Sequence, residues 1–99
     1  MPRGSPRLRT PDKKMNQLGL RVKNRRHSLK LTQDALCAIL ARVTNGGWIP
    51  AQGDIYRIEN GSRIVSDVEI FALAEALECS PVWLLIGERD DLLPHPLDD

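Results

Sequence analysis

Residues 52–63, QGDIYRIENGSR, bring together side chains that could bind a polyanion. Ile55 and Ile58 have the spacing of a helix that turns one face toward a core. Arg57 lies inside this helix, and Arg63 follows the Asn-Gly pair that ends it. Gln and Arg can each form paired hydrogen bonds to a base edge, and arginines also contact phosphates. The segment therefore predicts a short helix whose outer face suits a nucleic acid.

The charges are uneven along the chain, although the net charge is only +1. Residues 1–30 hold ten of the 14 Lys and Arg and one acid, whereas residues 67–99 hold nine of the 13 acids and one base. A basic end can hold an anion while an acidic end avoids it. A solvated surface with uneven charge fits the same pattern, so charge alone leaves both interpretations open.

Patterns of catalytic or metal-binding residues do not occur in the sequence. It has no paired carboxylates for acid–base work, no Ser/His/Asp set and no glycine-rich phosphate loop. Cys37 and Cys79 lie in no CxxC motif, and we interpret Cys37 as a small buried side chain. His27 and His95 stand alone. We therefore expect no enzyme, no metal, no cofactor and no small-molecule substrate.

The length of 99 residues and the apolar content of 41% suit one domain with a modest core. No apolar run approaches the ~20 residues that cross a bilayer. The N-terminus lacks the apolar region of a signal peptide. We expect a cytoplasmic, nucleoid-associated protein with no membrane partner.

Five short helices and no strand are predicted, which is an all-α cluster. The first helix spans residues 16–30, and the second follows the N-cap Thr32. The third begins near Pro50 or Ala51, where a proline suits the first turn, and ends at about Glu59. Gly61 supplies the left-handed residue that closes it.

The last two helices have clear starting residues. Ser66 and Glu69 form a capping box before the fourth, and Ser80 with Pro81 opens the fifth, which ends at Gly87. The fourth helix is expected to bury an apolar face made of Val68, Phe71, Leu73, Ala74 and Leu77.

Composition divides the chain into three parts. Residues 1–14 contain three Pro, one Gly and five bases and are predicted to be a disordered basic arm, which a translation start at Met15 would remove. Residues 15–87 are predicted to form the folded domain. Residues 88–99, acidic and with two Pro, are predicted to be a mobile tail.

Three separated pieces, LTQDAL, IYRIENGSR and LAEALECSPVWLL, resemble the Cro/C1-type (XRE) helix-turn-helix family, which includes the phage repressors. The resemblance covers about residues 17–87. It implies a five-helix, lambda-repressor-like DNA-binding domain. The implied function is that of a sequence-specific transcriptional regulator, expected to be a repressor. It would bind double-stranded DNA as a homodimer.

The resemblance also implies roles for single residues, with the helix at about 51–59 entering the major groove. Base readout is assigned to Gln52, Gly53, Asp54, Tyr56 and Arg57. Phosphate contacts are assigned to Gln33, Asn60, Ser62 and Arg63. Arg26 and Glu59 are expected to form a structural ion pair.

Two features depart from the family. The connection between the second and third helices carries the surplus RVTNGGWI. Either the second helix continues through Arg42 and Val43, or a loop bulges outward. Trp48 could pack back, touch DNA or form a partner surface, and we favour packing. In the third helix Gly53 has no side chain for readout, and Asp54 could accept from a cytosine amino group or serve the helix start.

A second interpretation is a protein-binding module of the same fold, such as an antitoxin or an adaptor. Trp48 and the acidic tail motivate it. The apolar residues near the end of the chain are candidates for a dimer surface or for ordinary core: Leu84, Leu85, Ile86, Leu92 and Leu93. The basic arm could reach phosphates or a minor groove.

Overall fold

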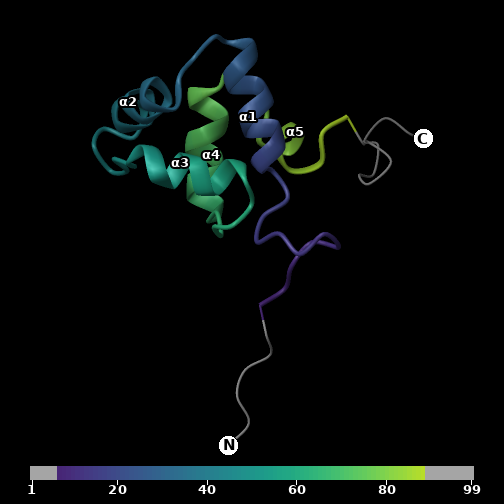
Figure 1. Cartoon of the computed structure of the whole chain (residues 1–99). Helices are drawn as coiled ribbons and strands as arrows, with labels where there is room; N and C mark the ends of the chain where they lie inside the picture. The colour runs from purple at the N-terminus through teal and green to yellow at the C-terminus, as the bar shows by residue number, and fades with distance from the viewer. Residues whose placement is uncertain (1–6, 89–99) are drawn as a thin grey trace, which may run out of the picture.

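The computed structural model describes residues 7–88, which fold into five α-helices (Figure 1). They are α1 (Gly19–Ser28), α2 (Gln33–Val43), α3 (Gln52–Glu59), α4 (Asp67–Ala76) and α5 (Pro81–Ile86). No strand occurs within residues 7–88, and the predicted all-α, five-helix architecture is confirmed. None of these helices is long and apolar enough to cross a membrane.

In Figure 1, α2 and α3 lie on one side of α4, and α5 lies on the other. Helix α4 packs against α2 and α5, and α3 packs against α1 and α2. Nine large side chains at the centre are almost completely buried: Leu18, Val22, Leu36, Leu40, Ile55, Ile58, Leu73, Leu77 and Leu84. Every helix thus contributes to one core, which holds α3 against its neighbours.

Local capping explains where most helices begin. Thr32 Oγ1 accepts a hydrogen bond from the Ala35 amide at 3.0 Å, as an N-cap should. The Ser66–Glu69 capping box is present in both directions. Ser80 caps α5 ahead of Pro81. These predictions are confirmed because a cap depends on only a few neighbouring residues.

The start of α3 differs from the prediction. Ala51 is the N-cap and has an extended backbone, so the helix begins at Gln52 and Pro50 lies before the cap. The Ala51 amide donates to Asp54 Oδ2 at 2.9 Å. This bond gives a partner to a backbone N–H at the helix start, where the helix itself supplies none. At the other end Gly61 has a φ of +82° and closes the helix as expected.

The predicted apolar face of α4 is wrong in two of its five residues. Val68 and Phe71 are 71% and 67% exposed, whereas Leu73, Ala74 and Leu77 are buried. Ala72, Leu73 and Ala76, with the C-cap Leu77, recur at the spacing of one helical stripe, and that stripe faces the core. Phe71 falls outside it, and Val68, one turn before Ala72 in the first turn of the helix, extends past the buried part of the stripe.

The long connection between α2 and α3 begins with an extended helix. Helix α2 continues through Val43, as one of the two alternatives predicted. Thr44 Oγ1 then accepts from the Trp48 amide at 2.9 Å and donates to the Leu40 carbonyl at 2.7 Å, which folds the following turn back. The Trp48 side chain packs against the core, and the Arg63 guanidinium lies 5.8 Å from its ring centre. Packing of Trp48, the favoured prediction, is confirmed.

Residues 10–14 form a defined turn, although their composition predicted disorder. Lys13 donates its amide to the Thr10 carbonyl at 2.8 Å, and the Met15 amide donates to the Gly61 carbonyl at 2.7 Å. Lys14 Nζ also reaches the Asn60 carbonyl at 2.9 Å. Main-chain pairing to the end of α3 therefore supplies the order that this segment could not obtain from a core of its own. Leu92, Leu93, His95 and the other residues of the acidic tail after Glu88 lie outside the described residues.

Candidate nucleic-acid interface

Helix α3 is buried along one side and open along the other. Ile55 and Ile58 are fully buried. Tyr56 is 58% exposed, and the Arg57 side chain is 52% exposed. Gln52, at the first helical position, is also exposed. The polar residues assigned to base readout therefore share a solvent-facing surface, with the core behind them.

A chain of polar side chains ties the start of α3 to α1 and α2. Arg26 Nε lies 2.6 Å from Glu59 Oε2, and Arg26 Nη2 donates to Glu59 Oε1 at 3.0 Å. Gln33 Nε2 donates to the same Oε1 at 3.0 Å, and Gln52 Nε2 donates to Gln33 Oε1 at 2.9 Å. Both charged side chains are less than a tenth exposed. The ion pair thus orients Gln33, and Gln33 orients Gln52.

The hydrogen bond to Glu59 raises the pKa of Arg26, so this guanidinium stays charged although it is buried. Within residues 7–88, no buried side-chain nitrogen or oxygen lacks a hydrogen-bond partner. A buried charge that is paired and fully hydrogen-bonded can be retained, whereas one left alone is strongly unfavourable.

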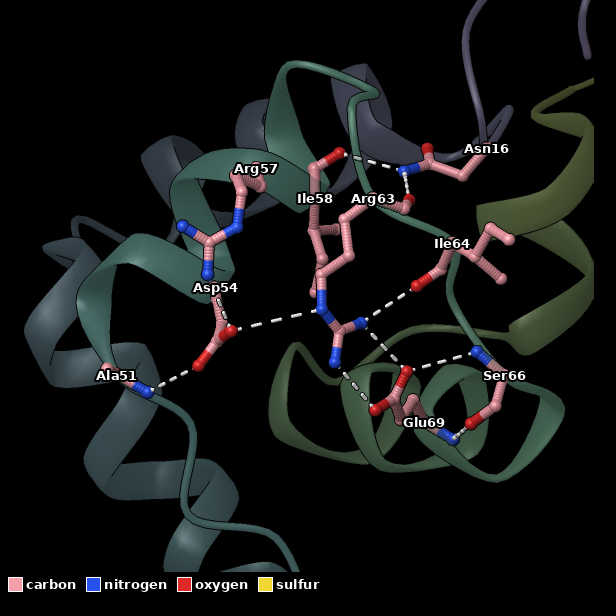
Figure 2. A network of polar contacts seen from close by, with 9 residues as sticks. All are labelled: Asn16, Ala51, Asp54, Arg57, Ile58, Arg63, Ile64, Ser66 and Glu69. Atoms are coloured by element: carbon pink, nitrogen blue, oxygen red, sulfur yellow. Dashed lines mark hydrogen bonds and ion pairs between the residues drawn. The ribbon is translucent and has the colours of Figure 1, made fainter.

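Asp54 lies between the start of α3 and two arginines (Figure 2). Its carboxylate accepts from the Ala51 amide and from Arg57 Nη2, each at 2.9 Å, and Arg63 Nε lies 3.9 Å from it. The backbone hydrogen bond from Ala51, followed by Arg57 and Arg63, holds the pKa of Asp54 below its ordinary value. The helix-start role considered for Asp54 is therefore present, and a contact with cytosine would compete with these partners.

Arg63 is occupied by partners within the chain (Figure 2). Its Nη1 and Nη2 donate to the two carboxylate oxygens of Glu69, both at 2.9 Å, and Nη1 also donates to the Ile64 carbonyl at 2.9 Å. These bonds raise the pKa of Arg63 and lower that of Glu69. The side chain is 24% exposed. The phosphate contact that the resemblance implies for Arg63 would have to compete with this bidentate ion pair with Glu69.

The loop after α3 exposes Asn60 and Ser62, the other two residues assigned to phosphate. Asn60 Oδ1 accepts from the Ser62 amide at 3.0 Å and from the Ser62 hydroxyl at 2.7 Å. Lys14, which was not among the predicted site residues, brings an ammonium group to the same loop through its bond with the Asn60 carbonyl. Only the tertiary structure places Lys14 there, since it lies 46 positions earlier in the chain.

Two further residues that the sequence analysis missed hold α3 in place. Asn16 Oδ1 accepts from the Leu18 and Gly19 amides, so α1 begins at Gly19 instead of residue 16, and Asn16 Nδ2 donates to the Ile58 carbonyl at 3.1 Å and to the Arg63 carbonyl at 2.8 Å. A Cβ on Gly19 would overlap the Ile58 carbonyl oxygen and approach that of Glu59 to 2.8 Å. Asparagine is favoured ahead of a helix because its side-chain oxygen can accept from amides two and three residues later, as Asn16 does. The need for Gly19 has no local signal.

These features define the class of the protein. Helices α2 and α3 pack together, and α3 shows a polar face while the other helices hold its apolar face. This is a helix-turn-helix domain with a lambda-repressor-like arrangement of five helices, enlarged between α2 and α3. Among residues 7–88, no group of three His, Cys, Asp or Glu side chains could hold a metal ion.

Comparison with known proteins agrees with this class. The chain is 31% identical over 83 residues to the HTH-type transcriptional regulator DicA of Escherichia coli (strain K12). The match covers 82% of this chain and 54% of the relative, so the chain spans about half the length of that protein. No family model and no solved structure matches. The chain is a distant homologue of an XRE-type helix-turn-helix regulator, which is not an enzyme, and the family resemblance is confirmed.

Proposed function

We propose that this chain is a sequence-specific DNA-binding transcriptional regulator, with α3 as the helix that enters the major groove. The observation that carries the proposal is the chain of contacts that runs from the buried pair Arg26 and Glu59 through Gln33 to the exposed Gln52. A core ion pair that orients an exposed glutamine is suited to a side chain that must meet a base in one geometry. The ~12 Å width of the major groove admits a helix of this kind.

Contacts with bases and with phosphates fall to different residues. Gln52, Tyr56 and Arg57 are the exposed side chains of α3 that could reach base edges. Gln33, at the first position of α2, together with Asn60 and Ser62 would contact the backbone, where helix N-termini favour phosphate. Lys14 adds a positive charge next to Asn60. Asp54 and Arg63 support this surface from within.

Binding as a homodimer is part of the proposal. Two copies of α3 one helical turn of DNA apart, ~34 Å, would read a palindromic site. Leu84 is buried in the core and is removed from the candidate dimer residues, whereas Leu85 and Ile86 are half-buried. A regulator of this kind acts in the cytoplasm on the nucleoid, and repression is the activity that the family resemblance favours.

Selection of bound duplexes from a random pool tests this function. We expect an enriched palindrome, and an affinity that falls by ~0.9 log unit per phosphate contact for each tenfold increase in salt. Failure to retain any duplex at low ionic strength would contradict the proposal. The alternative, a protein-binding module, predicts no enriched sequence and a partner affinity that depends only weakly on salt.

A further inference from the structure

Gly53 leaves a space on α3 that the Arg57 side chain uses. A Cβ built on Gly53 would lie 3.2 Å from Arg57 Nη1 and 3.9 Å from Arg57 Cζ. The guanidinium therefore lies back over the first turn of the helix, where a larger residue would stand. The backbone of Gly53 does not have a positive φ, so helix geometry does not require a glycine there. Since glycine is a poor helix former, its value at this position lies in the room it leaves.

Asp54 holds the guanidinium from the other side. Arg57 Nη2 donates to Asp54 Oδ1 at 2.9 Å, while Asp54 Oδ2 accepts from the Ala51 amide at 2.9 Å. Arg63 Nε lies 3.9 Å from the same Oδ1 (Figure 2). Both carboxylate oxygens are thus engaged, and the carboxylate is itself anchored to the helix start. An arginine held in this way loses less rotamer entropy when it binds than one that is free in solvent.

We propose that Gly53, Asp54 and Arg57 form one reading unit that recognises a guanine in the major groove. Arg57 contacts the base, Asp54 is a positioning residue, and Gly53 determines specificity by leaving the guanidinium its place. The inference rests on the proposed function, because it needs α3 in the groove. Guanine presents two acceptors, O6 and N7, there, and the fork of an arginine matches both. One bond to Asp54 leaves the other N–H groups of Arg57 for the base.

The charges around Asp54 make this assignment compatible with DNA. A lone carboxylate at the start of a recognition helix would repel phosphates. Here Arg57 and Arg63 both lie within 4 Å of it, so its charge is compensated. The Asp54 carboxylate is ionised at neutral pH, as its bond with Arg57 requires, and its neighbours hold its pKa below the ordinary value.

The test compares base preferences of the full chain and four variants by selection from a random duplex pool. We expect the wild type to enrich a guanine at one position of each half-site, and Arg57→Lys to bind DNA but lose that preference, because lysine lacks the fork. Gly53→Ala and Asp54→Asn should each reduce the preference for guanine at this position by about fivefold or more and leave other positions unchanged. Asp67→Asn, which removes an exposed acid from the start of α4, is the matched control and should leave the base preference unchanged at every position.

Thermal unfolding of the same variants separates specificity from folding. Gly53→Ala should be as stable as the wild type or more stable, since alanine favours a helix and only the flexible end of Arg57 must move. Asparagine at 54 can still accept the bond from the Ala51 amide. The proposal of a reading unit would be contradicted if the guanine preference survived in both Gly53→Ala and Asp54→Asn. It would also be contradicted if these variants weakened base preference equally at all positions of the site. If the wild type retains no duplex, the proposed function itself fails; if it enriches a site that Arg57→Lys does not alter, only this inference fails.

Discussion

Gln33 and Gln52, the first residues of α2 and α3, are joined by a side-chain hydrogen bond of 2.9 Å. Gln33 donates in turn to Glu59, which the buried Arg26 holds in place. The orientation of an exposed side chain is thus determined from inside the domain. The consequences of this relationship can be measured.

Replacing Gln33 by alanine should weaken DNA binding more than it weakens the fold. Gln52 would lose the acceptor that orients it, and the proposed phosphate contact of Gln33 would be lost as well. The free energy of unfolding should fall by only about 0.5–1.5 kcal/mol, the net value of an ordinary hydrogen bond. Urea unfolding and titration of a selected duplex measure the two effects. Unchanged affinity would show that the bond between the glutamines has no part in binding.

Replacing Glu59 by alanine should destabilise the domain severely. Arg26 would remain buried with its charge uncompensated, which costs about 3–5 kcal/mol in such cases. A double variant, Arg26→Met with Glu59→Leu, removes both charges and should be more stable than the single variant. Denaturant unfolding at neutral pH provides the comparison. A single variant as stable as the wild type would mean that the pair is not buried in solution.

Gly19→Ala should destabilise the domain although alanine is the better helix former. The added methyl group would meet the carbonyl oxygens of Ile58 and Glu59, so α1 and α3 would have to separate. Overpacking of this kind costs about 1–3 kcal/mol. A melting temperature lower by several degrees is expected. Gly53→Ala is the matched control, because only a flexible side chain stands in its way, and any stabilisation by Gly19→Ala would contradict the close approach of the two helices.

Stability should decrease in acid in part through Glu69 and Asp54. Hydrogen bonds from Arg63 to Glu69, and from the Ala51 amide to Asp54, hold both carboxyl pKa values below their ordinary range. The unfolded chain therefore takes up protons first as the pH falls. The stabilisation is complete above the ordinary carboxyl pKa of ~4 and is lost as the pH drops through the lowered folded-state values.

Unfolding free energies at neutral and acidic pH measure this dependence. Glu69→Gln should lower the unfolding free energy at neutral pH by about 1 kcal/mol, because the ion pair of Glu69 with Arg63 is bidentate but partly exposed. The variant should also lose less stability than the wild type as the pH falls. Asp67→Asn, at an exposed position without an ion pair among residues 7–88, should keep the wild-type profile. Equal profiles for the wild type and Glu69→Gln would show that the Arg63 pair does not form.

Helix content, caps and most of the core could be predicted from sequence because they depend on neighbouring residues. The caps at Thr32, Ser66 and Ser80 act over two or three positions, and helical spacing marked Ile55 and Ile58 as core. On α4 the same reasoning failed for Val68 and Phe71. The apolar residues of α4 lie on several of its faces, so their spacing could not show which face would pack against α2.

By itself, therefore, the sequence determined the all-α class, the capped starts of α2, α4 and α5 and the polar outer face of α3, since these follow from local hydrogen bonding and periodicity. Only the tertiary structure decided that Arg63 pairs with Glu69, that Arg63 also approaches Asp54, and that Gly19 must lack a side chain. The physical reason is that these contacts depend on how side chains orient and on how closely separate helices approach, and residue type and spacing specify neither.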